Sequence, residues 1–422
     1  MSTRRRDFLR SSLSAATLVS IGGPTIPGFL ARSARAASAE GTGDEGRILV
    51  VLQLLGGNDG LNTVVPHALD GYSRNRKRIR LASGQLHRID DQVGLHPRMG
   101  KLAELLERDR LAIVQGVGYP NPDRSHFRSM EIWETARTDS GPEAIETGWI
   151  GRVLDAHPPK PGQDPPALHI GAGRSPLATK AKRVEVPSLE RVDQFRLQLA
   201  GAAPEQRSAR TAMSDVARVD RGDDPLLGFL RRSTLSAYES SRRLEEVAGT
   251  DGDSSYPNYG LAQRLKQVAR LIKAGFGTRI YYTRQDGYDT HANQFDTHAA
   301  LLNELADSLA AFHDDLAGAG LNDRVAVLVF SEFGRRLAEN ASGGTDHGAA
   351  APVFVVGPVR HAGLIGEHPS LEPDDLDDGD PRFHTDFRRV YAAMLDHWLG
   401  LPSAPIVGEG FEPLPLLPPA RG

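Results

Sequence analysis

The sequence has 422 residues, of which 39% are hydrophobic and 25% are charged, and its formal net charge at pH 7 is −4. This composition supports a packed core and excludes a chain that is disordered or of low complexity throughout. The near balance of acidic and basic residues gives no reason to expect nucleic acid or an anionic membrane as a partner. Cysteine is absent, which excludes disulfides, thiolate catalysis and Cys-ligated zinc. A bound metal ion would therefore need His, Asp, Glu or backbone oxygen ligands.

Residues 1–36 have the pattern of a twin-arginine signal peptide. Arg5-Arg6-Asp7-Phe8-Leu9 precedes a weakly apolar run at 13–31, and Ala34 and Ala36 supply small residues at positions −3 and −1 of a cleavage site. The apolar run is too short and too polar to span a membrane, and no later segment has about 18 consecutive apolar residues. We therefore expect a periplasmic or extracellular protein that uses the twin-arginine export machinery and has no stable membrane span.

The remainder, 45–422, has the pattern of a single α/β domain. Continuous apolar runs predict buried strands, and apolar residues at helical spacing predict amphipathic helices. In chain order the predicted elements are a strand at 48–55, a helix at 97–109, a strand at 111–114, a helix at 125–137, a short strand at 168–170, helices at 226–248 and 260–275, a strand at 278–282, a helix at 295–316, strands at 324–330 and 352–356, and a helix at 386–399. This alternation predicts a mostly parallel sheet sandwiched by helices. A Pro- and Gly-rich segment at about 138–225 is predicted to be an irregular insertion or cap.

Polar side chains gather in the loops beside the predicted strands. Ligands of open α/β sheets bind beyond the carboxyl ends of the strands, so these loops are expected to meet at one edge. The loops are 56–60, 121–126, 286–291, 331–335 and 345–348, the last of which precedes its strand. Most of them carry carboxylates together with histidine or amide groups, which predicts a metal or acid–base site. The loop at 56–60 lacks the spacing of a dinucleotide- or phosphate-binding loop, so a nucleotide cofactor is not expected.

Each candidate residue also has a structural role open to it. Asp59 lies in a Gly-rich turn, where Asn and Asp are common for conformational reasons alone. Ser125 opens a predicted helix, either as its N-cap or as a nucleophile near the helix N-terminus. Asp289 and His291 stand two apart in an irregular loop, which suits Zn²⁺, Mn²⁺ or Fe but is also compatible with a capping Asp beside a solvated His.

The later candidates allow the same choice. Glu332 directly follows an apolar strand, where a buried carboxylate is costly unless a metal ion or an arginine such as Arg335 neutralises it. Asp346 and His347 lie in a Gly-rich loop, which lets the backbone approach a ligand closely. His384 opens the last predicted helix, where the residues after it could simply form a cap. The remaining histidines are predicted to be structural, among them His67, His96, His126 and His169.

Several motifs resemble the bacterial family called domain of unknown function 1501, over about residues 47–400 and with a twin-arginine leader. They are LLGGNDGLNTVVP at 54–66, GLHP at 94–97, GYPNP at 118–122, SHFRSM at 125–130, DTH at 289–291, SEFGRR at 331–336 and GTDHG at 344–348. The family is distantly similar to the alkaline phosphatase and sulfatase superfamily, which implies an alkaline-phosphatase-like fold more firmly than an activity.

The superfamily holds two divalent metals and a Ser or Thr nucleophile at a helix start, and the order of its elements implies roles here. Asp59 resembles its Asp after the first strand, and Ser125 resembles its nucleophile. Asp289 and His291 resemble its Asp/His pair, although His291 stands two positions after Asp289, where the superfamily pair stands four apart.

Two assignments stay open for the remaining elements of the superfamily site. In one, Asp346-His347 is the Asp-His pair and His384 is the late histidine. In the other, which is slightly preferred, Glu332 takes the place of the carboxylate after a strand and His347 is the late histidine. The second assignment leaves Phe333 where the superfamily has a ligand histidine.

The function that these features imply is an exported, metal-dependent hydrolase of phosphate or sulfate esters. Its substrate would be a small-molecule or polymer-borne anionic ester, and its cofactor one or two divalent ions, with Zn²⁺ or Mn²⁺ expected. Ser125 as nucleophile and Arg335 as a group that steadies anionic charge are the expected catalytic residues. The main alternative is a non-catalytic secreted binding protein whose metal site is partly lost. A cofactor-loaded oxidoreductase is suggested only by the export signal.

Overall fold

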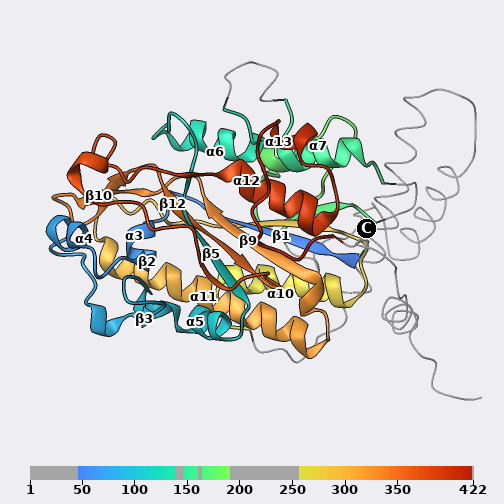
Figure 1. Cartoon of the computed structure of the whole chain (residues 1–422). Coiled ribbons are helices and arrows are strands. Elements are labelled where there is room, and N and C mark those ends of the chain that lie inside the picture. The colour runs from blue at the N-terminus through green and yellow to red at the C-terminus, as the bar shows by residue number, and fades with distance from the viewer. Residues whose placement is uncertain (1–45, 139–145, 160–163, 191–255, 421–422) are drawn as a thin grey trace, which may run out of the picture. The chain divides into compact units, whose positions relative to one another are not determined.

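A mixed β-sheet between two layers of helices forms the centre of the fold (Figure 1). The computed structural model describes residues 46–138, 146–159, 164–190 and 256–420. The predicted signal peptide at 1–36, the predicted helix at 226–248 and part of the predicted insertion lie outside these described residues. No helix within the described ranges is both long enough and apolar enough to cross a membrane.

The main sheet has nine strands among the described residues. Across the sheet the order is β13 (Gly363–Ile365), β5 (Leu111–Gly118), β12 (Ala351–Val356), β9 (Val325–Ser331), β1 (Ile48–Leu54), β8 (Ile280–Gln285), β6 (Ala167–Ile170) and β7 (Ser188–Leu189), while β14 (Thr385–Asp386) pairs with β5. β12 is antiparallel to both of its neighbours, and the other pairs are parallel. The predicted α/β class with a mostly parallel sheet sandwiched by helices is therefore confirmed.

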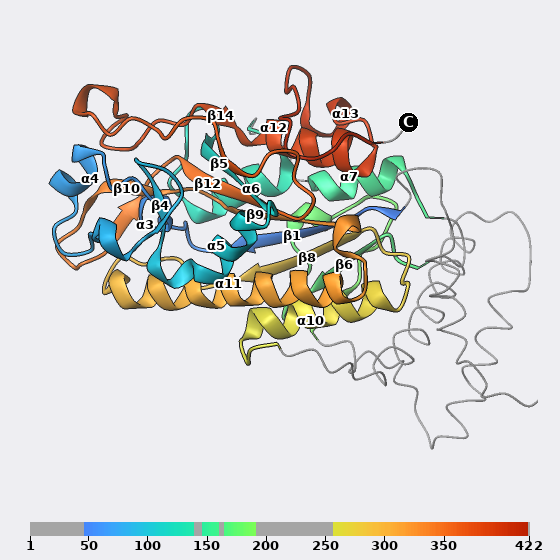
Figure 2. The ribbon, with the colours of Figure 1, turned by 60° about the horizontal axis from the view of Figure 1, so that its bottom comes forward.

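The helices cover both faces of this sheet (Figure 2). One layer contains α5 (Gly100–Glu107), α10 (Gly260–Lys273) and α11 (Gln294–Gly318), and the other contains α6 (His126–Thr135), α7 (Trp149–Ala156), α12 (Phe387–Ala392), a π-helix (Ala393–Leu399) and α13 (Ala404–Val407). The described part of the predicted insertion supplies α7, β6 and β7. This part therefore contributes to the sheet and to its helical cover.

Smaller elements lie around the main sheet. They are α3 (Gly60–Thr63), α4 (Asp70–Asn75), the small sheet of β2 (Val64–Val65), β4 (Gly94–Leu95) and β3 (His87–Arg88), the pair β10 (Arg335–Glu339) and β11 (Thr345–His347), and 3₁₀ turns at Ser83–Gln85, Pro97–Met99, Leu177–Thr179, Asn322–Arg324 and Pro373–Asp375. Most of these elements are absent from the sequence prediction, because segments of two to six residues are too short to show a periodicity.

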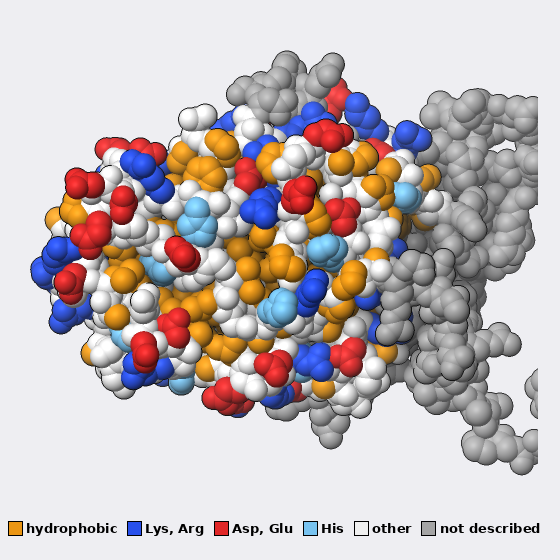
Figure 3. Space-filling view, in the orientation of Figure 1, with side chains coloured by type: hydrophobic (Ala, Val, Ile, Leu, Met, Phe, Trp, Pro, Cys, Tyr) orange, Lys and Arg blue, Asp and Glu red, His pale blue; other side chains and the backbone are white. Residues whose placement is uncertain are grey.

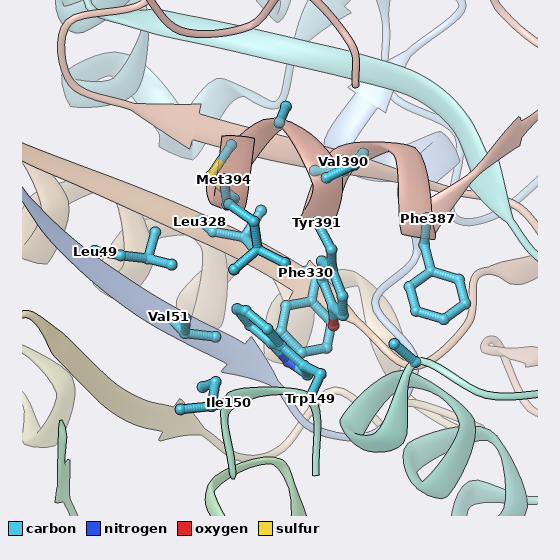
Figure 4. Close-up of a cluster of buried hydrophobic side chains, with 14 of the residues drawn as sticks. Leu49, Val51, Trp149, Ile150, Leu328, Phe330, Phe387, Val390, Tyr391 and Met394 are labelled. Atoms are coloured by element: carbon cyan, nitrogen blue, oxygen red, sulfur yellow. The ribbon is translucent and has the colours of Figure 1, made fainter. Parts of the chain in front are cut away.

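The central strand β1 is buried on both of its faces. All seven of its residues are buried, as expected for a strand whose alternate side chains enter two helical layers. Val50 belongs to the hydrophobic cluster that includes α10 and α11, whereas Leu49 and Val51 belong to the cluster that includes α6, α7 and α12. Figure 4 shows the second cluster, in which Trp149 stacks on Tyr391 with 4.6 Å between the ring centroids.

The surface drawn in Figure 3 carries acidic, basic and apolar side chains in alternation, without a large field of one sign. This distribution is expected for a chain that has 50 basic and 54 acidic residues. The electrostatics of the protein are therefore decided by local groups of charges rather than by its net charge.

The direction of β12 brings several polar loops to one edge of the sheet. β1, β8 and β9 are mutually parallel, so the loops that follow them meet at the edge where these strands end. β12 runs in the opposite direction, and the loop that precedes it therefore reaches the same edge. β5 is also antiparallel to β12, so the loop between β5 and α6 arrives there too. Figure 1 shows β10 at this end of the sheet.

Candidate metal centre

Two glycines after β1 let the polar loops approach one another closely. Gly56 and Gly57 have φ angles of 117° and 74°, a backbone conformation that favours glycine. A Cβ atom on Gly56 would lie 2.3 Å from the backbone nitrogen of Asp289, and one on Gly57 would lie 2.2 Å from the ring of Phe333. The Gly56-Gly57 pair therefore packs the loop after β1 directly against the loops after β8 and β9.

Three histidines at this edge are each held through Nδ1 by an oxygen atom. His126 Nδ1 lies 3.0 Å from Glu332 Oε1, and His291 Nδ1 lies 3.1 Å from Asp346 Oδ1. His347 Nδ1 lies 2.7 Å from the backbone oxygen of residue 124. Because carboxylate and carbonyl oxygens only accept hydrogen bonds, Nδ1 donates in each case and the neutral ring keeps its lone pair on Nε2.

These three Nε2 atoms point toward the carboxylate of Asp289. Asp289 Oδ1 is 3.1 Å from Nε2 of both His291 and His347, and these two nitrogens are 2.9 Å apart. His126 Nε2 is 3.5 Å from Asp289 Oδ2, and it is buried without a hydrogen-bond partner among the described residues. One ligand atom each of His126, Asp289 and His347 fit within 4.8 Å of one another. We call His126, Asp289, His291 and His347 the His–Asp cluster.

The His–Asp cluster has the donor set of a divalent metal site. Three imidazole nitrogens and one carboxylate oxygen are a set that Zn²⁺ and related ions bind. A tetrahedral Zn²⁺ site with bonds of about 2.0–2.1 Å places its ligand atoms about 3.3 Å apart, and three of the separations here are 2.9, 3.1 and 3.1 Å. Histidines held through the other ring nitrogen are typical of metal sites. The residues present therefore fit a metal ion, which would relieve the contact between facing lone pairs.

The electrostatics of the site favour the ligand forms of Asp289 and His347. Partial burial raises the pKa of Asp289, but the hydrogen bond and the charge of Arg335 outweigh it and lower the pKa to about 2. Burial lowers the pKa of His347. The hydrogen bond to Glu332 raises the pKa of His126 against the effect of its partial burial. Near neutral pH, Asp289 is therefore ionised and His347 is neutral, as ligation requires.

Arg335 holds the loops of the site together and does not face open space. Its side chain is completely buried. Nε donates to the carbonyl of Gly57 at 2.7 Å, Nη1 to that of Thr345 at 2.8 Å, and Nη2 to that of Tyr288 at 3.0 Å and to Asp289 Oδ1 at 2.8 Å. The sequence predicted that Arg335 steadies the charge of an anionic substrate. In the structure its N–H groups instead donate hydrogen bonds to the protein's own carbonyl and carboxylate oxygens.

Glu332 and Asp346 orient histidines in place of the ligand role predicted from the sequence. Glu332 is buried, and its Oε1 accepts from the backbone nitrogen of Gly56 at 2.8 Å as well as from His126. Asp346 Oδ1 accepts from Asn340 Nδ2 at 3.2 Å and from His291. The burial cost of Glu332 is thus offset by hydrogen bonds rather than by an arginine or a direct metal bond.

The structure places two other predicted ligands away from the cluster. Asp59 is fully buried, and Arg76 binds both of its oxygens at 2.5 and 2.9 Å. Burial raises the pKa of Asp59, and the charge of Arg76 more than compensates and lowers it. His384 Nε2 lies 2.9 Å from the carbonyl of Glu367, and its Nδ1 lies 3.0 Å from Thr385 Oγ1. Neither residue contacts the His–Asp cluster in the hydrogen bonds of the described chain.

Ser125 lies between two residues that contact the cluster. The carbonyl of Arg124 holds His347, and His126 belongs to the cluster itself. Ser125 is the N-cap residue of α6, but its hydroxyl makes no capping hydrogen bond, and the residue is exposed. The predicted alternative of a side-chain cap is therefore not realised, and the residue is open to solvent.

The sequence prediction missed His126. It was grouped with the structural histidines, because a histidine in the first turn of a helix has no distinctive pattern by itself. A usable signal was its position directly after Ser125, in a loop already identified as one of those at the sheet edge. Asp289, His291 and His347, by contrast, were predicted as metal ligands, and the fold brings them together.

The family described as "Protein of unknown function (DUF1501)" matches residues 47–401. No curated relative matches the sequence. Several solved structures are similar at low sequence identity. The PsFucS1 sulfatase from Pseudoalteromonas sp. is 11% identical, with 90% of this chain and 76% of that chain covered and a TM-score of 0.35.

Two further structures are similar to a comparable degree. The C-terminal periplasmic domain of EcEptC from Escherichia coli, in complex with Zn, is 10% identical. The match covers 74% of this chain and 73% of that chain, with a TM-score of 0.31. The alkaline phosphatase from the Antarctic bacterium TAB5 is 12% identical. The match covers 73% of this chain and 91% of that chain, with a TM-score of 0.30. At these values the likeness does not identify an activity.

Proposed function

Since the chain belongs to the DUF1501 family, whose description names no activity, we propose from the site itself that it is an exported, metal-dependent hydrolase of phosphate or sulfate esters. The observation that carries the proposal is the convergence of three histidine Nε2 atoms on Asp289, together with Ser125, which directly precedes His126 in the chain and whose hydroxyl makes no capping hydrogen bond. A ligand-type cluster next to an exposed hydroxyl is the arrangement that metal-assisted ester cleavage needs.

The residues of the chain have separate roles in the proposed reaction. A bound divalent ion would polarise the ester oxygens and lower the pKa of a nearby hydroxyl or water. Ser125 Oγ would lose its proton to solvent and attack the phosphorus or sulfur atom, and its position at the N-terminus of α6 favours the developing negative charge. The ester bond would break with release of the alcohol, and water would then cleave the seryl ester to return Ser125 and free phosphate or sulfate. Asp289, kept ionised by Arg335, and the three histidines would hold the ion.

Arg124 and Arg336 are the cations available to an anionic substrate in place of Arg335. Their side chains are 36% and 32% exposed, and both donate to Asp378, whose side chain is 74% exposed. Such exposed ion pairs contribute little to stability, so an anionic ester could displace Asp378 at modest cost. Both arginines also pair with the buried Asp380, Arg124 at 2.6 Å and Arg336 at 3.7 Å, and these contacts would stay in place. The backbone of Arg124 contacts His347, which places this guanidinium on a segment that adjoins the cluster.

We propose one ion per chain, the lower of the two numbers expected from the sequence. A second ion would need Asp59 as a ligand. The carboxylate of Asp59 is already neutralised by the buried guanidinium of Arg76. Zn²⁺ fits the donor set best, and Mn²⁺ is the second candidate.

Export is part of the same proposal. Its support is Arg5-Arg6 and the small residues Ala34 and Ala36, which lie outside the described residues. Twin-arginine export carries folded proteins, so an ion could be bound before the protein leaves the cytoplasm.

We expect the mature protein to hydrolyse at least one aryl phosphate or aryl sulfate, and a chelator to abolish that activity. Ser125→Ala should keep the metal ion but lower the rate by about 10²-fold or more, because the nucleophile is lost while the ligands remain. Turnover and metal content are measured on the same preparations. Ser83→Ala, at an exposed serine of a 3₁₀ turn, is the matched control and should change neither quantity.

Two outcomes of this experiment would contradict the proposal. If Ser125→Ala turned over as fast as Ser83→Ala, Ser125 would not be the nucleophile. If the folded, metal-loaded protein were inert toward a broad panel of phosphate and sulfate esters, the proposed hydrolase would be replaced by the secreted binding protein.

A further inference from the structure

Gln294, the first residue of α11, is completely buried, and its side-chain amide is bonded at both ends. Nε2 donates to Asp59 Oδ2 at 2.5 Å. Oε1 accepts from Thr290 Oγ1 at 3.1 Å and from Thr345 Oγ1 at 2.6 Å. One amide therefore connects three segments that are far apart in the sequence.

The two threonines belong to the two loops that carry most of the His–Asp cluster. Thr290 lies between Asp289 and His291, and Thr345 lies two residues before His347. The loops also meet directly, because the backbone nitrogen of Thr345 donates to the carbonyl of Thr290 at 3.3 Å. The spacing between His291 and His347 therefore depends on contacts that Gln294 completes.

The other end of the amide is attached to a rigid anchor. Asp59 and Arg76 form an ion pair in which both side chains are fully buried. Arg76 also donates through Nε to the carbonyl of Leu337 at 3.1 Å and through Nη2 to that of Arg336 at 3.0 Å. These carbonyls belong to β10, whose Arg335 pairs with His347 of β11. The buried pair therefore cannot rotate without disturbing the strands beside the cluster.

We propose that Gln294 is a positioning residue that holds the loops of His291 and His347 at ligand distance and thereby sets the metal affinity of the site. Gln294 itself does not contact the ion. It transmits the rigidity of the Asp59–Arg76 pair to Thr290 and Thr345. This inference rests on the proposed metal centre and adds to it the buried residues that build it.

The test compares Zn²⁺ affinities of folded, metal-free variants by competition with a chromophoric chelator. Gln294→Met keeps the length of the side chain but removes all three hydrogen bonds, and it should lower the affinity by about 10- to 100-fold, as loss of a partner outside the ligand set does. Gln263→Met on α10, where the glutamine is exposed, is the matched control and should bind like the unmodified protein.

A second pair of variants keeps the test decisive if Gln294→Met fails to fold. Thr345→Val removes the hydroxyl while keeping the shape, and Thr345→Ser keeps the hydroxyl. We expect Thr345→Val to lose affinity in the same range and Thr345→Ser to bind close to the unmodified protein. A purely structural role would instead lower the urea stability of Thr345→Val and leave the Zn²⁺ affinity of the folded protein unchanged.

The outcomes separate this inference from the proposed function. If the unmodified protein bound no Zn²⁺, the metal centre and the role of Gln294 would both be overturned. If the unmodified protein bound Zn²⁺ and both Gln294→Met and Thr345→Val bound it equally well, only the positioning role would be overturned.

Discussion

Replacing His347 with alanine is expected to remove the metal ion and the ester hydrolysis together. His347 Nε2 lies 2.9 Å from His291 Nε2 and 3.1 Å from Asp289 Oδ1, so this ring occupies the middle of the ligand set. Loss of a direct ligand should lower metal affinity by more than the roughly 10- to 100-fold that loss of an outer partner costs. Elemental analysis after dialysis and turnover of an aryl ester measure the two effects.

His361→Ala is the matched control for this prediction, because His361 is exposed in the described chain and does not belong to the cluster. It should retain both metal and activity. A His347→Ala protein that kept as much metal as His361→Ala would show that the ring is not a ligand.

Replacing Arg76 with methionine is expected to lower the free energy of unfolding by about 3–5 kcal/mol, because it leaves Asp59 buried without its counter-charge. The two side chains are fully buried and their closest atoms are 2.5 Å apart. The carbonyls of Leu337 and Arg336 would lose their donors as well. Urea unfolding followed by fluorescence of the buried tryptophans measures the change, and adding Asp59→Asn should recover part of it by removing the charge.

Arg74→Met, in the last turn of α4, provides the control, since Arg76 is the C-cap residue of the same helix. Arg74 pairs with Glu372, and the two side chains are 53% and 62% exposed, so the loss should stay below about 1 kcal/mol. If Arg76→Met were no less stable than Arg74→Met, the buried pair would not anchor this part of the fold.

The central strands could be predicted from the sequence because they are buried on both faces. β1 and β9 are almost unbroken apolar runs, with one polar residue each, and few other structures accommodate such runs. The apolar run of β12 gives no information on strand direction, so its antiparallel pairing had to come from the structure. The last predicted helix is continuous in the sequence pattern, but its second half, Ala393–Leu399, is a π-helix.

The ligand loops of the site were accessible to sequence reasoning, but the pairing of charges within it was not. Asp289, His291 and His347 follow or precede strands that end at one edge, and this rule was enough to group them. The sequence does not show that Arg76 folds back onto Asp59. It also does not show that Glu332 meets His126, a residue 206 positions away. Long-range partners such as these decide whether a carboxylate binds a metal ion or a side chain.

Metal content of the purified mature protein tests the metal centre most directly. We expect about one Zn²⁺ or Mn²⁺ ion per chain, removed by a chelator and restored on adding the ion, because His126, Asp289 and His347 form one ligand group and His291 contacts two of its members. The melting temperature should rise when the ion is added to the metal-free protein. Less than about 0.2 ion per chain, together with no thermal stabilisation by Zn²⁺ or Mn²⁺, would contradict the metal centre.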